Sequence, residues 1–266
     1  MAAAVAAAVR GVAGTEAGRV VGAVGAGGDR TATVDRVAED AVVAACERLA
    51  ASGMRFRLRS EELGDRSFGA DFPLLLVDPV DGSRNAMQGI PFFSTSLAVL
   101  DGERLGDVIA GVVHSLAGPG TFSAVRGGGA QRDGRPLRPL RVGLSSGGAV
   151  PMLLIEGHGL LGRPPDGSRV TALLRCAQRV RLLGSSALSL CQVATGAASA
   201  LVTRGGMRPW DCAAGLCVLA EVGAMVTDLT GAPVDTVPAE FGRRIPLLAS
   251  LDPGVHARVL EVLTAD

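Results

Sequence analysis

The chain has 266 residues, 48% of them hydrophobic, and its formal net charge is zero because 26 arginines balance 26 acidic residues. A chain of this length buries a large core as one α/β domain or as two packed lobes. It has no basic stripe and no apolar run near 18 residues, so we expect neither a nucleic-acid partner nor a membrane span. The five cysteines are scattered without a CxxC pair, which indicates reduced thiols in a cytoplasmic protein.

The first half of the chain predicts two helices followed by a largely antiparallel sheet. The alanine-rich residues 1–14 are typical of a first helix, because no basic residue precedes them as in a leader. Apolar residues then recur at helical spacing over 34–49, and Gly53 closes that helix. Strand-like runs bounded by Gly, Pro and Asp follow at 56–60, 74–77, 94–100, 107–114 and 121–125.

The second half alternates strands with helices, which is the pattern of a layered α/β lobe. Strand-like runs occur at 152–156, 179–183, 199–203, 224–227 and 247–250, and helical runs at 169–177, 187–195, 211–222 and 253–263. The Gly- and Ser-rich stretch 144–150 is the best boundary between lobes. We therefore predict an α/β (α+β) fold with an N-terminal lobe of residues 1–143 and a C-terminal lobe of residues 144–266.

The stretch DPVDGS places two carboxylates at the mouth of a buried strand. We expect that strand to end near Asp78, Pro79 to fix the backbone, and Asp81 with Gly82 to form a turn. Two carboxylates three residues apart around such a turn can face one point, where they repel each other unless a cation lies between them. Oxygen ligands of this kind suit Mg²⁺ best, with Mn²⁺ as a possible substitute.

Other acidic residues could complete such a site. Glu61 and Glu62 follow a strand-like run, Asp211 opens an apolar helix, and Asp35 begins the helix of residues 34–49. Ordinary structural roles are the alternative for these carboxylates. The two glutamates could simply lie on a solvent-exposed face, Asp211 could cap its helix, and Asp81 could be a turn residue. Together they predict a group of carboxylates for a hard cation.

The sequence contains two long motifs, LVDPVDGSRNAMQGIPFFSTSLAV and WDCAAGLCVLAEVGA, in this order. They resemble the two signatures of the inositol monophosphatase family, the Mg²⁺-dependent, lithium-sensitive sugar phosphatases. The stretches AVRGGGAQRDGRPL, LLGSSALSLCQVATG and DLTGAPVD resemble further segments of that family, so the resemblance covers nearly the whole chain. It implies a layered αβαβα sandwich and a homodimer.

The resemblance also implies roles for individual residues. The metal ligands would be Glu61, Asp78, the carbonyl of Val80, Asp81 and Asp211, with two or three Mg²⁺ ions in each site and Asp35 at an additional, weaker metal position. Catalytic roles would belong to Glu61, Ser83 and Asp35, with Glu61 and Ser83 orienting a metal-activated water for in-line attack. The substrate-binding positions would be Gly82, Ser83, Gly184, Ser185, Ser186, Arg204 and Asp211.

Arg204 distinguishes this chain from the animal-type members, which resemble one another in carrying a glutamate seven residues before the motif aspartate. A cation there favours a substrate with a second anionic group, and RGGMRPWD looks more like archaeal-type members that act on inositol phosphates and fructose bisphosphate. The alternative is that Arg204 and Arg208 are ordinary solvent-exposed side chains that do not contact the substrate.

The expected function is Mg²⁺-dependent hydrolysis of a small-molecule phosphate ester, inositol 1-phosphate and/or fructose 1,6-bisphosphate. Within the family, the alternatives are a 3′-phosphoadenosine 5′-phosphate phosphatase and a histidinol-phosphate phosphatase. From a different class, the alternative is a non-catalytic binding module that retains the fold.

Overall fold

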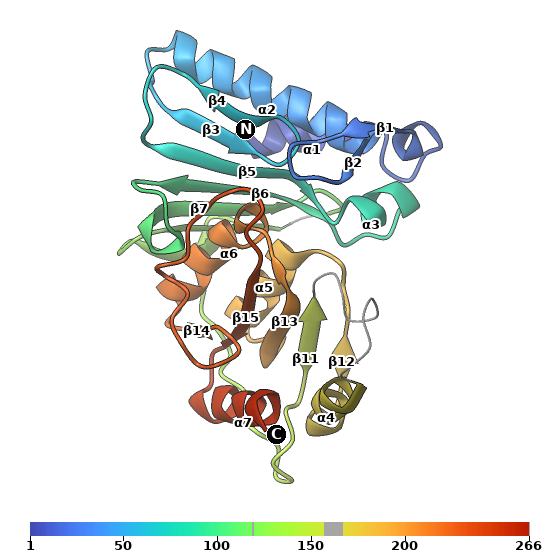
Figure 1. The fold of residues 1–266 in the computed structure, drawn as a ribbon, viewed down its shortest axis with the longest axis vertical. Coiled ribbons are helices and arrows are strands. Elements are labelled where there is room, and N and C mark those ends of the chain that lie inside the picture. The colour runs from blue at the N-terminus through green and yellow to red at the C-terminus, as the bar shows by residue number, and fades with distance from the viewer. Residues whose placement is uncertain (119, 157–166, 266) are drawn as a thin grey trace.

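Five layers of helices and sheets stack on one another in the computed structural model, which describes residues 1–118, 120–156 and 167–265 (Figure 1). The helices, in chain order, are α1 (Ala2–Arg10), α2 (Thr33–Ala51), α3 (Ser83–Gln88), α4 (Gly167–Cys176), α5 (Ser186–Thr195), α6 (Pro209–Glu221) and α7 (Pro253–Thr264), with 3₁₀ turns η1 (Ala17–Arg19) and η2 (Leu105–Asp107). Helices α1 and α2 cover one face of the larger sheet, α5 and α6 lie between the two sheets, and α4 and α7 cover the far face of the smaller sheet. The predicted αβαβα sandwich is confirmed.

The larger sheet carries the residues of the first motif. Within the described ranges its strand order is β10 (Arg135–Pro136), β9 (Gly129–Arg132), β8 (Thr121–Val125), β7 (Val108–Ser115), β6 (Ser94–Leu100), β5 (Leu74–Asp81), β3 (Arg57–Ser60) and β4 (Gly64–Ser67). All neighbouring pairs are antiparallel except β3 and β5. Because that parallel register pairs Ser60 with Val77, Glu61 and Asp78 follow at the same edge of the sheet.

The smaller sheet supplies the other half of the architecture. Its described strands lie in the order β12 (Val180–Arg181), β11 (Leu153–Glu156), β13 (Ala200–Met207), β15 (Ile245–Ser250) and β14 (Met225–Thr227), and a separate hairpin pairs β1 (Val21–Val24) with β2 (Arg30–Ala32). The connection from β10 to β11 contains residue 144, and the lobe boundary placed there stays a prediction.

Several element ends differ from the expected ones, and two of these belong to the elements that carry the two long motifs. Strand β5 continues to Asp81 instead of ending near Asp78, because β6 resumes pairing with it beyond an irregularity in the register. Pro79, which has no N–H to donate, lies within that irregularity. Helix α6 begins at Pro209, two residues before Asp211, because proline is favoured in the first helical turn.

Helix α6 passes through the largest apolar cluster and is packed closely on both sides. A Cβ atom added to Gly111 of β7 would lie 2.6 Å from the Ala214 carbonyl oxygen, and one added to Gly215 would lie 2.8 Å from Cβ of Leu190. At the start of the helix, the Ser96 hydroxyl donates to the Trp210 carbonyl oxygen over 2.8 Å. These contacts hold α6 between β6 and β7 of the larger sheet on one side and α5 on the other.

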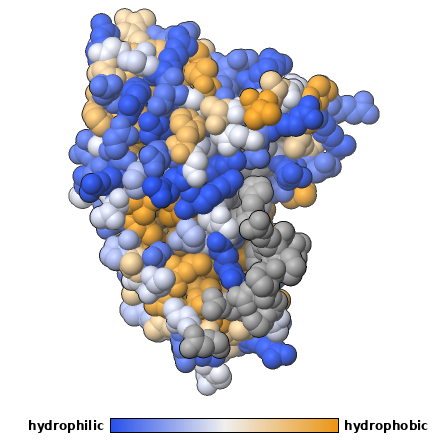
Figure 2. Space-filling model, viewed as in Figure 1, coloured by the Kyte–Doolittle hydropathy of each residue, from blue (hydrophilic) through white to orange (hydrophobic). Residues whose placement is uncertain are grey.

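The hydropathy of the surface differs between the N-terminal and C-terminal halves on the face shown in Figure 2. Hydrophilic residues cover most of the N-terminal half on that face, whereas hydrophobic residues gather over the C-terminal half. Among the described helices, none combines the length and the apolar composition that crossing a membrane requires.

Candidate active site

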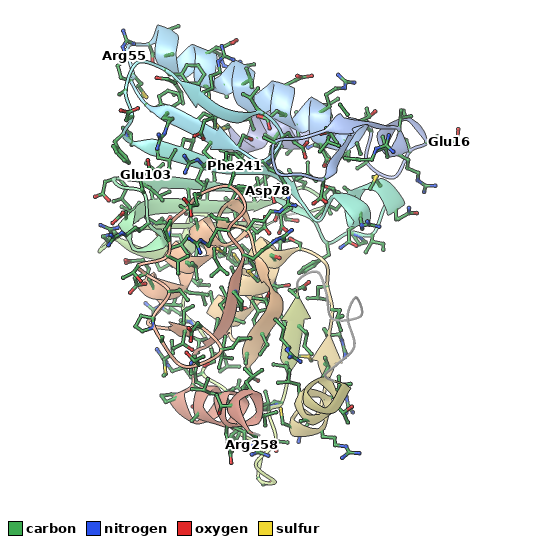
Figure 3. The ribbon with its side chains drawn as sticks, viewed as in Figure 1. Glu16, Arg55, Asp78, Glu103, Phe241 and Arg258 are labelled. Atoms are coloured by element: carbon green, nitrogen blue, oxygen red, sulfur yellow. The ribbon has the colours of Figure 1, made fainter. Side chains whose placement is uncertain are left out.

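Three carboxylates from separate elements meet between the larger sheet and α6. Glu61 follows β3, Asp78 lies on β5, and Asp211 lies in the first turn of α6. One oxygen atom from each lies within 4.8 Å of the other two, and Figure 3 places Asp78 at this junction of the two halves. These three of the predicted metal ligands are therefore brought together by the fold.

Local hydrogen bonds hold two of these carboxylates in place. Asp78 accepts a bond from the Val80 amide over 2.9 Å, and Asp211 accepts one from the Arg208 amide over 3.0 Å. The second of these bonds satisfies a free amide at the helix N-terminus. Each aspartate thus accepts a hydrogen bond from the backbone and also contributes one oxygen to the group of three carboxylates.

Burial and mutual repulsion raise the pKa values of the carboxyls at this site. Burial raises the pKa of Glu61 to about 8, and the charge of Asp211 adds to that rise. Burial also raises the pKa of Asp78 well above its ordinary value, with the charge of Glu61 as the second cause. A charged state of this group therefore needs a compensating cation.

Asp81 lies at the N-terminus of α5 and is not among the three carboxylates that meet. Its carboxylate accepts hydrogen bonds from the Ser185 hydroxyl, from the Ser186 amide over 3.0 Å and from the Ala187 amide over 2.8 Å. A helix N-terminus attracts negative charge because its amides are unpaired and its dipole is positive there. Asp81 therefore joins the first motif to the C-terminal half, and its role as a metal ligand stays a prediction.

Ser83 lies between Asp35 and the backbone of the first motif. Its hydroxyl oxygen is 2.5 Å from Oδ1 of Asp35 and 2.8 Å from the Val80 carbonyl oxygen. Asp35 also accepts a bond from the Ala32 amide, and burial raises its pKa. The single hydroxyl proton of Ser83 can serve only one of these two acceptors at a time.

The turn before α5 approaches the first motif closely. Gly82 has a φ of +93°, and a Cβ atom added there would lie 2.8 Å from the Gly184 carbonyl oxygen. Asn85 donates from Nδ2 to the carbonyl oxygens of Leu183 and Phe92 over 2.7 Å and 2.8 Å. Gly82 therefore lies against Gly184, whereas the roles of Gly82, Gly184, Ser185 and Ser186 in substrate binding stay predictions.

Arg208 is a site residue that the sequence reasoning missed. Surface solvation is wrong for it, because its side chain is only 8% exposed and forms ion pairs with Glu61 and, over 2.5 Å, with Asp29. Its guanidinium carbon also lies 5.7 Å from the centre of the Trp210 ring. The only sequence signal was its position in the tripeptide before Asp211.

Arg204 lies on β13, seven residues before Asp211, and is half-buried. Its assignment to the substrate stays a prediction.

Glu62, the neighbour of Glu61, accepts a hydrogen bond from Thr31 of β2. Glu61 therefore belongs to the group of three carboxylates, whereas Glu62 binds the β1–β2 hairpin.

A family model described as the inositol monophosphatase family matches residues 1–259. The chain belongs to that family. An inositol-1-monophosphatase of Mesorhizobium japonicum is 35% identical over 208 residues, which are 77% of this chain and 74% of that protein. A fructose-1,6-bisphosphatase/inositol-1-monophosphatase of Methanothermobacter thermautotrophicus is 31% identical, over 94% of this chain and 89% of that protein. A solved inositol monophosphatase of Thermotoga maritima, 27% identical, superposes with a TM-score of 0.74 over 98% of this chain and 93% of that one.

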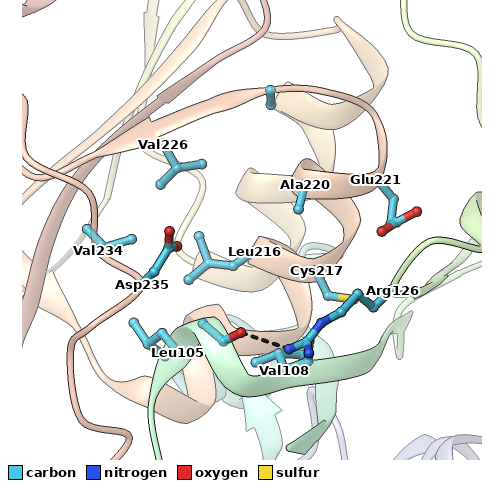
Figure 4. Close-up of a pocket in the computed structure, with 12 residues that line it drawn as sticks. Leu105, Val108, Arg126, Leu216, Cys217, Ala220, Glu221, Val226, Val234 and Asp235 are labelled. Carbon is cyan, nitrogen blue, oxygen red and sulfur yellow. Dashed lines mark hydrogen bonds between the residues drawn. The ribbon is translucent and has the colours of Figure 1, made fainter.

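As a member of the inositol monophosphatase family, the protein is a phosphoric monoester hydrolase. A separate pocket of about 510 Å³ lies near the C-terminal end of α6, the end opposite Asp211 (Figure 4). Two of its charged residues already bind backbone, since Arg126 donates to the Val108 carbonyl and Glu221 accepts from two glycine amides. The carboxylate group is therefore the candidate active site of this inositol monophosphatase family member.

The stability of the metal-free inositol monophosphatase family member should fall as pH rises from about 6.5 to 8.5. The pKa of Glu61 is raised to about 8 and that of Asp81 to about 7, in both cases first by burial. The folded state therefore holds protons that the unfolded chain has already lost, and each unit of rising pH reduces its advantage. A loss of roughly 1 kcal/mol corresponds to about 2–4 °C in Tm for a chain of this size.

Thermal unfolding in EDTA across this pH range measures the effect. Histidines with lowered pKa values, His114 and His256, oppose it only near or below their ordinary value of 6.5. Buried thiols such as Cys46 and Cys217, whose pKa burial raises to about 11, add to the decline towards pH 8.5, so the part below about pH 7.5 reports the carboxylates. Mg²⁺ should remove that part of the decline. A Tm in EDTA that stays level or rises from pH 6.5 to 8.5 would contradict the expected charge repulsion.

Proposed function

We propose that this protein is a Mg²⁺-dependent phosphomonoesterase that hydrolyses a small sugar or polyol phosphate, namely inositol 1-phosphate and/or fructose 1,6-bisphosphate. The observation that carries the proposal is the meeting of Glu61, Asp78 and Asp211 between the two halves of the chain. The names of the two curated relatives support the same pair of substrates.

The donor set fits a hard divalent cation. All three groups are carboxylates, their oxygens lie within 4.8 Å of one another, and burial, with mutual repulsion second, raises the pKa values of Glu61 and Asp78. Carboxylate oxygens without sulfur or imidazole favour Mg²⁺, with Mn²⁺ as a substitute. Asp81, Asp35 and the Val80 carbonyl are the proposed further ligands for a second or third ion.

When bound, Mg²⁺ lowers the pKa of a coordinated water and neutralises charge on the phosphoryl oxygens. Glu61 and Ser83 would orient the attacking water, with the Ser83 hydroxyl donating its hydrogen bond to Asp35 over 2.5 Å so that the hydroxyl oxygen can accept from the water. Gly82 and Ser83 would present backbone amides to the phosphate, and Gly184 and Ser186 would face the hydroxyl side of the substrate. Ser185 is fully buried and would act through its hydrogen bond to Asp81. Hydrolysis then needs no covalent intermediate with the protein.

Phosphate release tests the activity and the substrate together. Inositol 1-phosphate, fructose 1,6-bisphosphate, histidinol phosphate and 3′-phosphoadenosine 5′-phosphate are compared with Mg²⁺, with Mn²⁺ and with EDTA. We expect release from the first two with metal and none in EDTA. Faster release from either of the last two would assign the protein to the corresponding alternative, and metal binding without release from any ester would support a non-catalytic module.

Replacing Arg204 with glutamate should lower kcat/KM more for a bisphosphate than for a monophosphate. A cation at this position favours a second anionic group, and reversing its charge should cost about 2–3 kcal/mol of bisphosphate binding, roughly 30–150-fold in kcat/KM. Steady-state kinetics on fructose 1,6-bisphosphate and inositol 1-phosphate measure the ratio. Equal losses on the two substrates would remove Arg204 from substrate selection.

Further proposals concern regulation and assembly. We propose inhibition by Li⁺, a homodimer and a cytoplasmic location for the protein. A Li⁺ titration of phosphate release at fixed Mg²⁺ tests the first. Light scattering coupled to size-exclusion chromatography tests the second, and fractionation of cells that express the chain tests the third.

A further inference from the structure

Glu156 is a buried carboxylate at the end of β11 that none of the proposed roles uses. It is only 5% exposed, and all its described hydrogen bonds go to one short segment of the chain. It accepts from the Leu183 amide over 2.9 Å, from the Gly184 amide over 3.1 Å and from the Ser189 hydroxyl over 2.7 Å. The second carboxylate oxygen also lies 3.1 Å from the Gly184 amide.

These partners make Glu156 one of two supports of the turn that precedes α5. The turn carries the Leu183 amide toward Glu156 and the Leu183 carbonyl oxygen toward Asn85 of the first motif. Gly184 is exposed and has a φ of +85°, so the turn faces outward while its amides face the buried carboxylate. Glu156 and Asn85 therefore hold opposite sides of the same residue.

The residues immediately after this turn are those that hold Asp81. The Ser185 hydroxyl and the Ser186 and Ala187 amides all donate to that aspartate. A displacement of the turn would move all three donors together, because they are consecutive residues at the start of one helix. The position of Asp81 thus depends on a turn that Glu156 supports from the far side.

We propose that Glu156 is a positioning residue for the active site, which sets the substrate-facing start of α5 by holding the Leu183–Ser185 turn. Its four contacts come from three donors, because the Gly184 amide is shared between the two oxygens, and Oε1 also accepts from Leu183 and Ser189. No donor is needed at this position, so an acceptor suits both oxygens. Glutamine would place an NH₂ group against a backbone amide or a hydroxyl. The kinetic part of this inference rests on the proposed function, whereas the structural part does not.

The test compares Glu156→Gln with Thr203→Val. Thr203 is the register neighbour of Glu156 on β13, is fully buried, and its hydroxyl has no hydrogen-bond partner among the described residues. Thr203→Val is therefore a matched control for a polar change at the same depth. Loss of about one hydrogen bond should raise KM for inositol 1-phosphate about tenfold in Glu156→Gln, with a much smaller change in kcat. Both constants should stay at their wild-type values in Thr203→Val.

Hydrogen exchange at the Ser186 and Ala187 amides gives a readout that needs no substrate. Both amides should exchange faster in Glu156→Gln than in the wild type or in Thr203→Val, while those within α7 should not change. Unchanged exchange at these two amides would overturn the inference, and so would an equal increase in both variants. A loss of Tm without faster exchange would reduce Glu156 to a purely structural residue and equally overturn it.

Two further outcomes remain distinguishable. If the wild-type protein releases no phosphate from inositol 1-phosphate, the proposed substrate fails and the exchange experiment alone decides the inference. If Glu156→Gln does not fold, Glu156→Asp replaces it, because aspartate keeps both acceptor oxygens but is one methylene shorter. Faster exchange at Ser186 and Ala187 is then expected, and wild-type protection there would overturn the proposal.

Discussion

Asp78→Asn should abolish metal binding and at the same time stabilise the metal-free protein. The amide is the same size as the carboxyl, and its oxygen can still accept the bond from the Val80 amide. It removes one charged ligand, so the loss of affinity should exceed the roughly 10–100-fold that loss of an outer partner costs. It also removes repulsion from a buried site, which should raise the free energy of unfolding in EDTA by on the order of 1 kcal/mol at pH 8.

Calorimetric titration with Mg²⁺, phosphate release and thermal unfolding in EDTA measure the three effects. Trp210, the only tryptophan, adjoins Asp211 and adds a fluorescence signal for metal binding. The gain in stability should shrink as the pH falls from 8 to 5, because the raised pKa of Asp78 favours its neutral form increasingly as acidity rises. Asp40→Asn is the control, because Asp40 pairs with Arg36 on the exposed face of α2. Wild-type Mg²⁺ affinity in Asp78→Asn would exclude Asp78 as a ligand.

Gly82→Ala should disable the active site through a steric clash rather than a change of charge. The new Cβ would lie 2.8 Å from the Gly184 carbonyl oxygen, and backbone oxygens cannot move aside as flexible side chains do. The turn before α5 would have to move away from the first motif, and a positive φ adds strain of roughly 1–3 kcal/mol. A shift of about 1 Å in a catalytic arrangement costs on the order of a hundredfold in rate.

Gly89→Ala separates the steric clash from the backbone strain of a positive φ. Gly89 also has a positive φ, of +75°, at the other end of the same helix α3, but the nearest atom to its added Cβ is Cα of Gly14 at an ordinary 3.5 Å. Both variants should lose stability in thermal unfolding, whereas only Gly82→Ala should lose about a hundredfold in kcat/KM. A similar loss of kcat/KM in both would attribute the effect to backbone strain alone.

Most of the fold and part of the site could be predicted from local sequence. The apolar spacing over 34–49 matches α2, because a single helix buries one stripe of side chains on the larger sheet. The DPVDGS stretch pointed to Asp78, since two carboxylates after a buried strand demand compensation. Local context offered Glu61 and Asp211 only as two of several acidic candidates, and the family resemblance selected them, because no spacing rule connects them with Asp78.

The residues that were missed act over long sequence separations. Arg208 reaches Asp29 across 179 positions, and the sequence gives no sign that an arginine beside a tryptophan will be buried. Glu156 ends a strand and meets a turn 27 residues later, a contact that exists only after β11 and α5 have packed. The β1–β2 hairpin was also missed, because its first strand is exposed throughout and shows no alternation of polar and apolar residues.

The order in which the chain is synthesised gives the carboxylate group a further property. Glu61 and Asp78 are made early, but their third companion, Asp211, begins a helix that follows almost four-fifths of the sequence, and this helix fills the space between the two sheets. A nascent chain that still lacks α6 therefore carries two acidic residues without a finished pocket. On the proposed function, hydrolytic activity would arise late in translation and together with the completed core, so an incomplete polypeptide would not act on phosphate esters before it has folded.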